Sequence, residues 1–188
     1  KTFGTQWEAS LGFNVAYFVE GEELFPELRL YAKYISNDGR HSWKAGYQAF
    51  SQLAPAEASA VFSKELKGEI FPLMKTESIS LDYNWKVSND QSFFASAYHN
   101  VYYNLPQSVD PNFGFSTFNQ LERYRIESSA VTGGGSARTY GLEFALRKMI
   151  IKDWYYIASA TVFRSFYTNA KGTEFPSQFD RKYSLSGT

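Results

Sequence analysis

The sequence predicts an all-β protein: an antiparallel transmembrane β-barrel, of which this chain is an internal segment of about 7–8 strands. Three observations support this fold class. Apolar side chains recur at every second position over long segments, short and long connections alternate between those segments, and the four tryptophans lie beside short connections. A period of two is the pattern of a strand with one apolar and one polar face.

Composition agrees with this fold class without deciding it. Aromatic residues make up 19% of the 188 residues, yet the mean hydropathy is −0.38. Transmembrane barrels combine interfacial aromatic residues with a polar lumen, although a soluble, aromatic-rich β-sandwich would have the same composition. The net charge of zero gives no sign of a nucleic-acid interface. The lack of cysteine excludes disulfides, thiolate catalysis and cysteine-ligated metals.

Membrane helices and a signal peptide are not expected within the sequence. It contains no apolar run of about 18 residues, which is what a transmembrane helix needs. The opening residues, KTFGTQWEAS, lack the basic and apolar regions of a signal peptide. We therefore expect the signal peptide of an exported parent protein to precede Lys1.

The first strand is predicted at 6–19. Every odd position from Trp7 to Val19 is apolar, whereas the even positions include Glu8 and Asn14. This alternation is longer than the strands of about 5–6 residues that are usual in globular proteins. It matches the roughly 9–11 residues that a tilted strand needs to cross a bilayer.

The later strands follow in order, and we expect each to pair antiparallel with its neighbours in sequence. The alternation recurs at 27–36, 41–50, 76–87 and 138–149. Two further strands carry aromatic residues on both faces, so the sequence leaves their polarity open, and an eighth strand begins near Arg181 and stops at Thr188. These two strands are 92–103 and 154–167.

The connections differ in length in a regular way. Tight connections are predicted at 37–40, 88–91 and 150–153, and the first contains Asp-Gly, a strong hairpin signal. Long connections are predicted between them, with a short helix at 54–68 inside the first. Outer-membrane barrels have short periplasmic turns and long extracellular loops, whereas a soluble sandwich has no reason to sort its loops. The long connections are 51–75, 104–137 and 168–180.

The tryptophans share an offset from the short connections. Trp43 and Trp154 follow short turns, Trp85 precedes one, and Trp7 starts a strand whose preceding turn should also be short. Indole prefers the membrane interface. We therefore predict that all four lie at one height, at the periplasmic end.

The alternation also assigns faces. Eight charged strand residues share the polar face, and because charge in lipid is costly, this face should line the lumen. Salt bridges to neighbours or to a plug are the favoured role for these residues, ahead of a substrate path. Leu11, Phe13, Leu30, Leu81, Leu142 and Phe144 should face lipid. The lumen-facing charged residues are Glu8, Arg29, Lys33, Lys44, Asp82, Lys86, Glu143 and Arg147.

No catalytic, metal or cofactor site is predicted, and the chain is not expected to be an enzyme. His41 and His99 are isolated and lack the spacing of a metal-binding pair. The run Gly133-Gly134-Gly135-Ser136 lacks the lysine of a phosphate-binding loop, and Arg138 stands where a G-x-S-x-G elbow would need its last glycine. This run is interpreted as a loop tip.

Four segments carry a resemblance to a known family. ARTYGLEFALRKMIIKDWYYIASATVFRSFY (137–167) resembles a late strand pair of TonB-dependent receptors, and GYQAFSQLAPAEASAVF (46–62) resembles their strand and large Pro-containing loop. KTESISLDYNWKVS (75–88) resembles the strand that follows, with Thr76 where proline is common, and FFASAYHNVYYNLPQSV (93–109) resembles the next. Their order and spacing are closest to receptors with an N-terminal carboxypeptidase-like regulatory domain.

This resemblance implies a 22-stranded, plugged barrel. Residues 1–188 would be part of that one barrel domain, with the plug, the TonB box and the C-terminal strands elsewhere in the parent. The parent would import a large, scarce nutrient (iron chelate, cofactor, glycan or peptide) across the bacterial outer membrane. Its partners would be outer-membrane lipid, the plug, TonB and a surface lipoprotein, but no nucleic acid. Candidate ligand contacts, which alternatively pack the loops together, are Phe113, Phe115, Phe118 and Tyr124.

Two other kinds of protein are also consistent with the sequence. A small structural or adhesive outer-membrane barrel would have no plug upstream. A soluble β-sandwich binding module would pack the Leu28/Leu30 face against the Ile79/Leu81 face.

Overall fold

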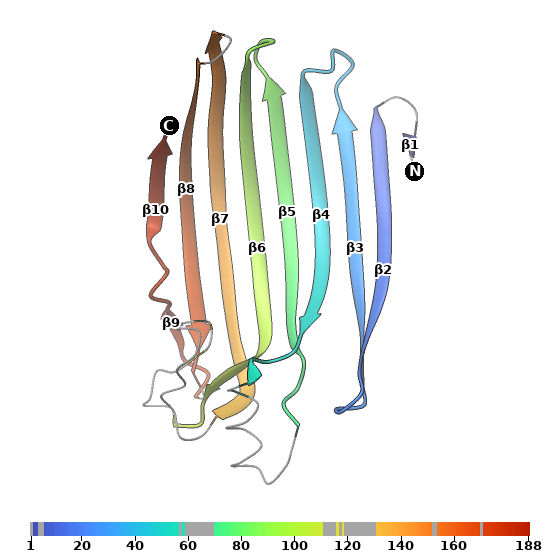
Figure 1. Cartoon of the computed structure of the whole chain (residues 1–188), viewed down its shortest axis with the longest axis vertical. Helices are drawn as coiled ribbons and strands as arrows, with labels where there is room; N and C mark the ends of the chain where they lie inside the picture. Colours follow the sequence, from blue (N-terminus) through green and yellow to red (C-terminus); the bar gives the residue numbers. More distant parts are fainter. Residues whose placement is uncertain are drawn as a thin grey trace.

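The described residues form one antiparallel sheet of 10 strands (Figure 1). The structure is a computed structural model, which describes residues 2–3, 6–56, 58, 70–110, 116, 118, 131–151, 154–169 and 171–188. The strands are β1 (Thr2–Phe3), β2 (Trp7–Phe18), β3 (Glu23–Ile35), β4 (His41–Gln52), β5 (Met74–Lys86), β6 (Gln91–Ser108), β7 (Val131–Ile151), β8 (Trp154–Thr168), β9 (Glu174–Pro176) and β10 (Lys182–Gly187).

Strand order in the sheet follows the sequence from β1 to β8, with β10 beside β8 and the short β9 also paired to β8. Every named pair is antiparallel. The predicted antiparallel order of the long strands is therefore confirmed. The sequence did not indicate β1 or β9, because strands this short carry no measurable alternation. The sheet is open between β1 and β10, and the two chain ends lie at opposite edges (Figure 1).

The connection between β2 and β3 corrects the predicted alternation of short and long connections. β3 begins at Glu23 rather than near residue 27, so only Val19–Glu22 joins the two strands, at the same end as the long connections (Figure 1). Glu22 closes this turn with a φ of 48°. The strand continues through Pro26 because β4 pairs with β3 only from Arg29 onward, so the missing N–H of proline disrupts no ladder there.

The long connections also differ from their predicted bounds. β6 continues to Ser108 and β7 begins at Val131, so the strands take up both ends of the predicted 104–137 connection. Register shifts between Tyr102 and Gln107 mark this extension as irregular. The predicted helix at 54–68 falls largely outside the described residues, although Ala56 and Ala58 are helical.

Buried apolar side chains of the described residues gather at the end that bears the long connections. Over the rest of the sheet, large apolar side chains remain exposed: Leu30 by 39%, Ile79 by 57% and Leu81 by 54%. The contact that a sandwich would make between these faces is therefore not formed. The buried apolar residues are Ala49, Ala58, Phe71, Leu73, Leu105, Val131, Ala137 and Tyr167.

Candidate functional site

The two faces of the sheet have opposite character, as the sequence predicts. Directly paired residues of neighbouring strands point to the same face. One continuous row runs from Glu8 through Lys33, Lys44 and Asp82 to Glu143. Arg29, Lys86 and Arg147 lie on the same face by register, whereas Leu11, Phe13, Leu30, Leu81, Leu142 and Phe144 lie on the opposite one.

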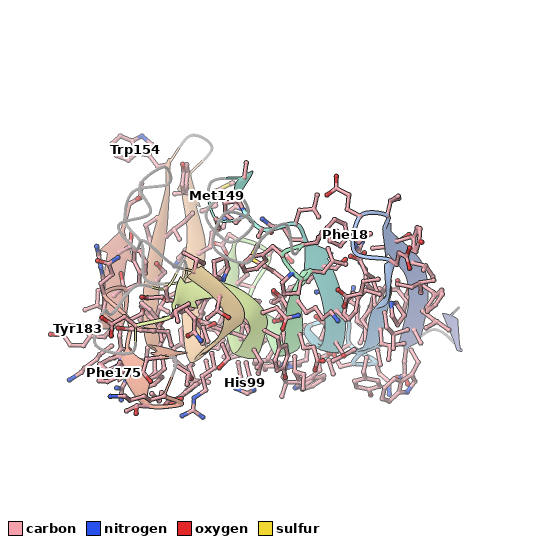
Figure 2. The ribbon with its side chains drawn as sticks, turned by 90° about the horizontal axis from the view of Figure 1, so that it is seen from below. Phe18, His99, Met149, Trp154, Phe175 and Tyr183 are labelled. Carbon is pink, nitrogen blue, oxygen red and sulfur yellow. The ribbon has the colours of Figure 1, made fainter. Side chains whose placement is uncertain are left out.

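The register also settles the two strands whose polarity the sequence left open. In β6, His99 pairs with Ile79 and lies on the apolar face, while Tyr98 lies on the polar face. In β8, Val162 pairs with Leu142 and lies on the apolar face, while Phe163 lies on the polar one. Figure 2 shows His99 on the opposite side of the sheet from Phe18, a polar-face residue of β2.

On β7 the apolar face carries an uncharged band bounded by charge at both ends. Arg138 and Lys148 share this face, and the side chains between them on it are Tyr140, Leu142, Phe144 and Leu146. The separation of the two charges corresponds to the roughly 9–11 residues with which a tilted strand crosses a bilayer. Leu142 within the band is 47% exposed, so this face is apolar and uncovered.

A belt of aromatic rings crosses the apolar face near the short turns. The rings of Trp7 and Tyr34 lie 4.8 Å apart, those of Tyr34 and Trp43 5.7 Å apart, and those of Trp43 and Tyr83 5.3 Å apart. His41 joins the belt: its ring stacks on Trp85 at 5.8 Å, and its Nδ1 lies 2.8 Å from the Tyr83 hydroxyl. Sequence reasoning identified the tryptophans as belt residues but not Tyr34, Tyr83 or His41. The available signal was that each of these three residues is in step with the alternating apolar residues of its own strand.

All four tryptophans lie near the short turns, as predicted, but they do not share one register row. Trp7 and Trp43 occupy the same row, and Trp85 lies in the next row of this face toward the turns. The row of Trp43 meets β8 at Ala160, so Trp154 lies still further toward the turn. β7 and β8 extend further past this row than β2 does, so the short-turn end runs obliquely across the hydrogen-bond rows. Such a stagger is the geometry of tilted strands in a barrel wall.

From β4 to β8 the polar face is divided into a charged half near the short turns and an uncharged half toward the long connections. In the uncharged half one row contains Gln48, Ser78, Asn100, Thr139 and Ser165, and this row continues to the charged Arg29 on β3. The amide of Asn100 donates to the Thr139 hydroxyl at 3.1 Å. The adjacent row, nearer the charged half, consists of aromatic and small residues: Tyr31, Gly46, Ser80, Tyr98, Gly141 and Phe163.

Acidic residues in the charged half bond to hydroxyl groups rather than to the lysines they face. Glu8 accepts a hydrogen bond from the Tyr31 hydroxyl at 2.7 Å, and Asp82 accepts one from Ser96 at 2.6 Å. The ammonium of Lys44 lies 5.0 Å from the centre of the Tyr31 ring. The predicted salt bridges between neighbours are thus not made by Glu8 or Asp82.

Glu27 is a site residue that sequence reasoning did not single out. It is 7% exposed, and its carboxylate accepts hydrogen bonds from Asn14 Nδ2 at 3.0 Å, from the Ser51 amide at 2.8 Å and from the Ser51 hydroxyl at 2.7 Å. Since the β3–β4 ladder ends at Arg29, the carboxylate replaces backbone pairing where the two strands separate.

The candidate ligand contacts are only partly covered. Phe113, Phe115 and Tyr124 lie outside the described residues. Phe118 packs its ring on Tyr102 at 4.9 Å, beside the buried cluster of Leu105, Ala137 and Tyr167. For Phe118 this contact favours the alternative role of packing the loops together.

Within the described residues, no group of three or more histidine, aspartate or glutamate side chains is arranged to hold a metal ion. The described part of the chain likewise contains no helix that is long and apolar enough to cross a membrane. No family model, curated protein or solved structure matches the chain.

Proposed function

We propose that this chain is part of the wall of an outer-membrane β-barrel belonging to a TonB-dependent transporter, which imports a large, scarce nutrient. The observation that carries the membrane assignment is the apolar face, with its uncharged band on β7 between Arg138 and Lys148 and its aromatic belt near the short turns. Lipid is the solvent that suits such a face, because a soluble domain of this size would bury it.

The polar face suits a lumen. Its charged half can contact a polar plug, and its uncharged half, toward the long connections, presents hydroxyl, amide and aromatic groups to a solute entering from outside. The transport assignment depends on the family resemblance of the strand and loop motifs, to which the two-zone lumen adds support. The barrel of the parent would be closed by strands beyond this sheet.

A pair of substitutions on β5 tests the membrane assignment in the full-length parent. Leu81 and Asn84 are both exposed but lie on opposite faces. Leu81→Arg should cost about 2–4 kcal/mol in the membrane and reduce the amount assembled in outer membranes, whereas Asn84→Arg should be tolerated. Equal effects of the two variants, or a folded protein that stays in the soluble fraction, would contradict the proposal. For transport, uptake should stop in cells lacking TonB.

A further inference from the structure

Two arginines stand on the apolar face of the β7–β8 pair, at its long-connection end, in or next to the register row that contains Glu77 of β5. Arg138 of β7 pairs with Phe166 of β8, and Arg164 lies two residues before Phe166, so all three point to this face. The guanidinium carbons of Arg138 and Arg164 lie 5.5 Å and 4.7 Å from the centre of the Phe166 ring. Both guanidinium groups therefore contact the same ring.

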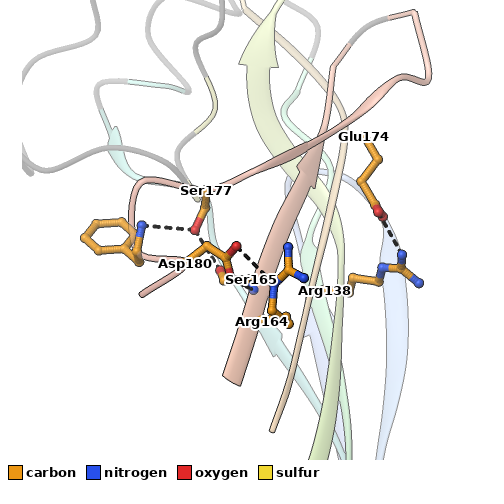
Figure 3. A network of polar contacts seen from close by, with 7 residues as sticks. Arg138, Arg164, Ser165, Glu174, Ser177 and Asp180 are labelled. Carbon is orange, nitrogen blue, oxygen red and sulfur yellow. Dashed lines mark hydrogen bonds and ion pairs between the residues drawn. The ribbon is translucent and has the colours of Figure 1, made fainter. Parts of the chain in front are cut away.

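Each arginine is oriented by an acidic residue of the segment between β8 and β10 (Figure 3). Arg138 Nη2 donates to Glu174 at 2.7 Å, and Arg164 Nε lies 3.1 Å from both carboxylate oxygens of Asp180. The Asp180 side chain is only 5% exposed, whereas that of Arg164 is 39% exposed. The carboxylate of Asp180 is thus covered, whereas the guanidinium of Arg164 remains accessible.

These contacts leave hydrogen-bond donors unused. A guanidinium has five N–H groups, and the ion pairs described here engage one nitrogen of each arginine. The Arg138 side chain is 47% exposed, so its remaining donors are accessible from the lipid side. An arginine in the hydrocarbon layer is costly, and this position therefore belongs at the level of the lipid headgroups.

We infer that Arg138 and Arg164 form a binding site for the phosphate group of an outer-leaflet lipid. The inference rests on the proposed membrane function. Guanidinium donors match phosphate oxygens in geometry and charge, and both groups contact the ring of Phe166 at the same end of the face. The described apolar face of β7 has one other cation, Lys148, at the opposite end of the uncharged band. Unlike Arg138, Lys148 has no second cation from the described residues of β7 or β8 beside it on this face.

The test uses the full-length protein in nanodiscs of phosphatidylcholine containing a small fraction of phosphatidic acid. Native mass spectrometry would count the phosphatidic acid molecules that remain bound. The double variant Arg138→Gln/Arg164→Gln should weaken this retention about tenfold, as expected for loss of roughly 1.4 kcal/mol or more of charge-assisted hydrogen bonding. Lys148→Gln is the matched control on the same strand and face, and should retain as much lipid as the unaltered protein.

Unchanged lipid retention in the double variant would overturn the inference, as would an equal loss of retention in Lys148→Gln. It would also be overturned if inorganic phosphate displaced the bound lipid as effectively as added phosphatidic acid does. Should the double variant not assemble, Glu174→Gln decides the matter: it keeps both arginines, removes the carboxylate charge that competes with phosphate for Arg138, and should increase retention. A decrease or no change would overturn the site. Failure of the proposed function is distinguishable, because the unaltered protein would then not be found in outer membranes at all.

Discussion

At the scale of single residues, Gly141 shows how the polar face makes room for its aromatic rings. A Cβ atom at this position would lie 2.9 Å from the Tyr98 hydroxyl, 2.8 Å from Phe163 Cβ and 2.6 Å from the carbonyl oxygen of Val162. The Val162 contact is with backbone, which cannot move without disturbing the β7–β8 ladder. Glycine is therefore required here by close approach rather than by its own backbone angles.

Gly141→Ala should destabilise the protein by about 1–3 kcal/mol through overpacking. Gly12→Ala is the matched control, because the nearest atom to a Cβ there is 3.6 Å away, in ordinary contact. Denaturant midpoints of the two variants in the same detergent would measure the difference. A denaturant midpoint that is lowered by Gly12→Ala and not by Gly141→Ala would contradict this prediction.

Asp38 gives the turn between β3 and β4 a dependence on pH. The pKa of Asp38 is lowered, first by the hydrogen bond from the Ser36 hydroxyl and then by the one from the Arg40 backbone N–H, at 3.0 Å. Because the folded pKa lies below the unfolded value of about 3.9, the stabilisation is complete above that value and disappears as the pH falls through the folded pKa.

Hydrogen exchange of the Arg40 amide should therefore speed up, after correction for intrinsic rates, as the pH is lowered below about 4. In Asp38→Asn the side chain still offers an oxygen to this amide but no longer titrates, so the pH dependence should vanish. An acceleration that persists in Asp38→Asn would assign the effect to another group.

At the scale of elements, β5 is the clearest case of a strand whose two faces differ in polarity, and the proposed function places them in different solvents. Ile79 and Leu81 point to the apolar face, and Ser80 and Asp82 to the polar face. The chain contains no cysteine, so a single cysteine introduced at any of these positions is a unique label.

Cysteines at 80 and 82 should react with a charged, water-soluble thiol reagent, and those at 79 and 81 should react only with a lipid-soluble one, since lipid-facing and lumen-facing residues alternate. Labelling of the assembled full-length protein in membranes would measure this. Uniform labelling at all four positions would show that water reaches both faces.

β3 shows what alternation alone does not reveal about an element. Its first residues include Pro26 and the buried Glu27, both of which argue against a strand when the sequence is considered by itself. The strand forms because β4 has already diverged, which makes Pro26 harmless and gives Glu27 its hydrogen-bond donors, Asn14 and Ser51. The start of β3 therefore depends on partners distant in sequence.

At the scale of the whole molecule, the proposed function implies that the tryptophan belt sets the depth of the sheet in the membrane. Single-tryptophan variants that retain only Trp7, Trp43 or Trp85 should be quenched most by lipids with a quencher near the headgroup, because these indoles lie within adjacent register rows. Trp154, which lies further toward the turn and is 67% exposed, should be quenched more by an aqueous reagent. Strongest quenching by lipids labelled at the chain end would contradict this placement.

The sequence by itself determined the strand order, the faces of the eight charged residues assigned to the polar face and of the alternating apolar residues, and the end at which the tryptophans lie. Each of these follows from local periods and turn chemistry, because a strand has a side-chain period of two whatever its neighbours are. The same periods could not place Tyr98 and Phe163, which lie in strands with aromatic residues on both faces.

Tertiary structure decided the rest, since it depends on pairing between strands. Register brought Arg138, Arg164 and Phe166 together from β7 and β8 and supplied their acidic partners from a third segment. It also placed His41 among the tryptophans and set Trp154 beyond the row of Trp43. The physical reason is that register and stagger are properties of strand pairs, fixed by ladder hydrogen bonds and turn lengths between distant residues, which no single strand's pattern contains.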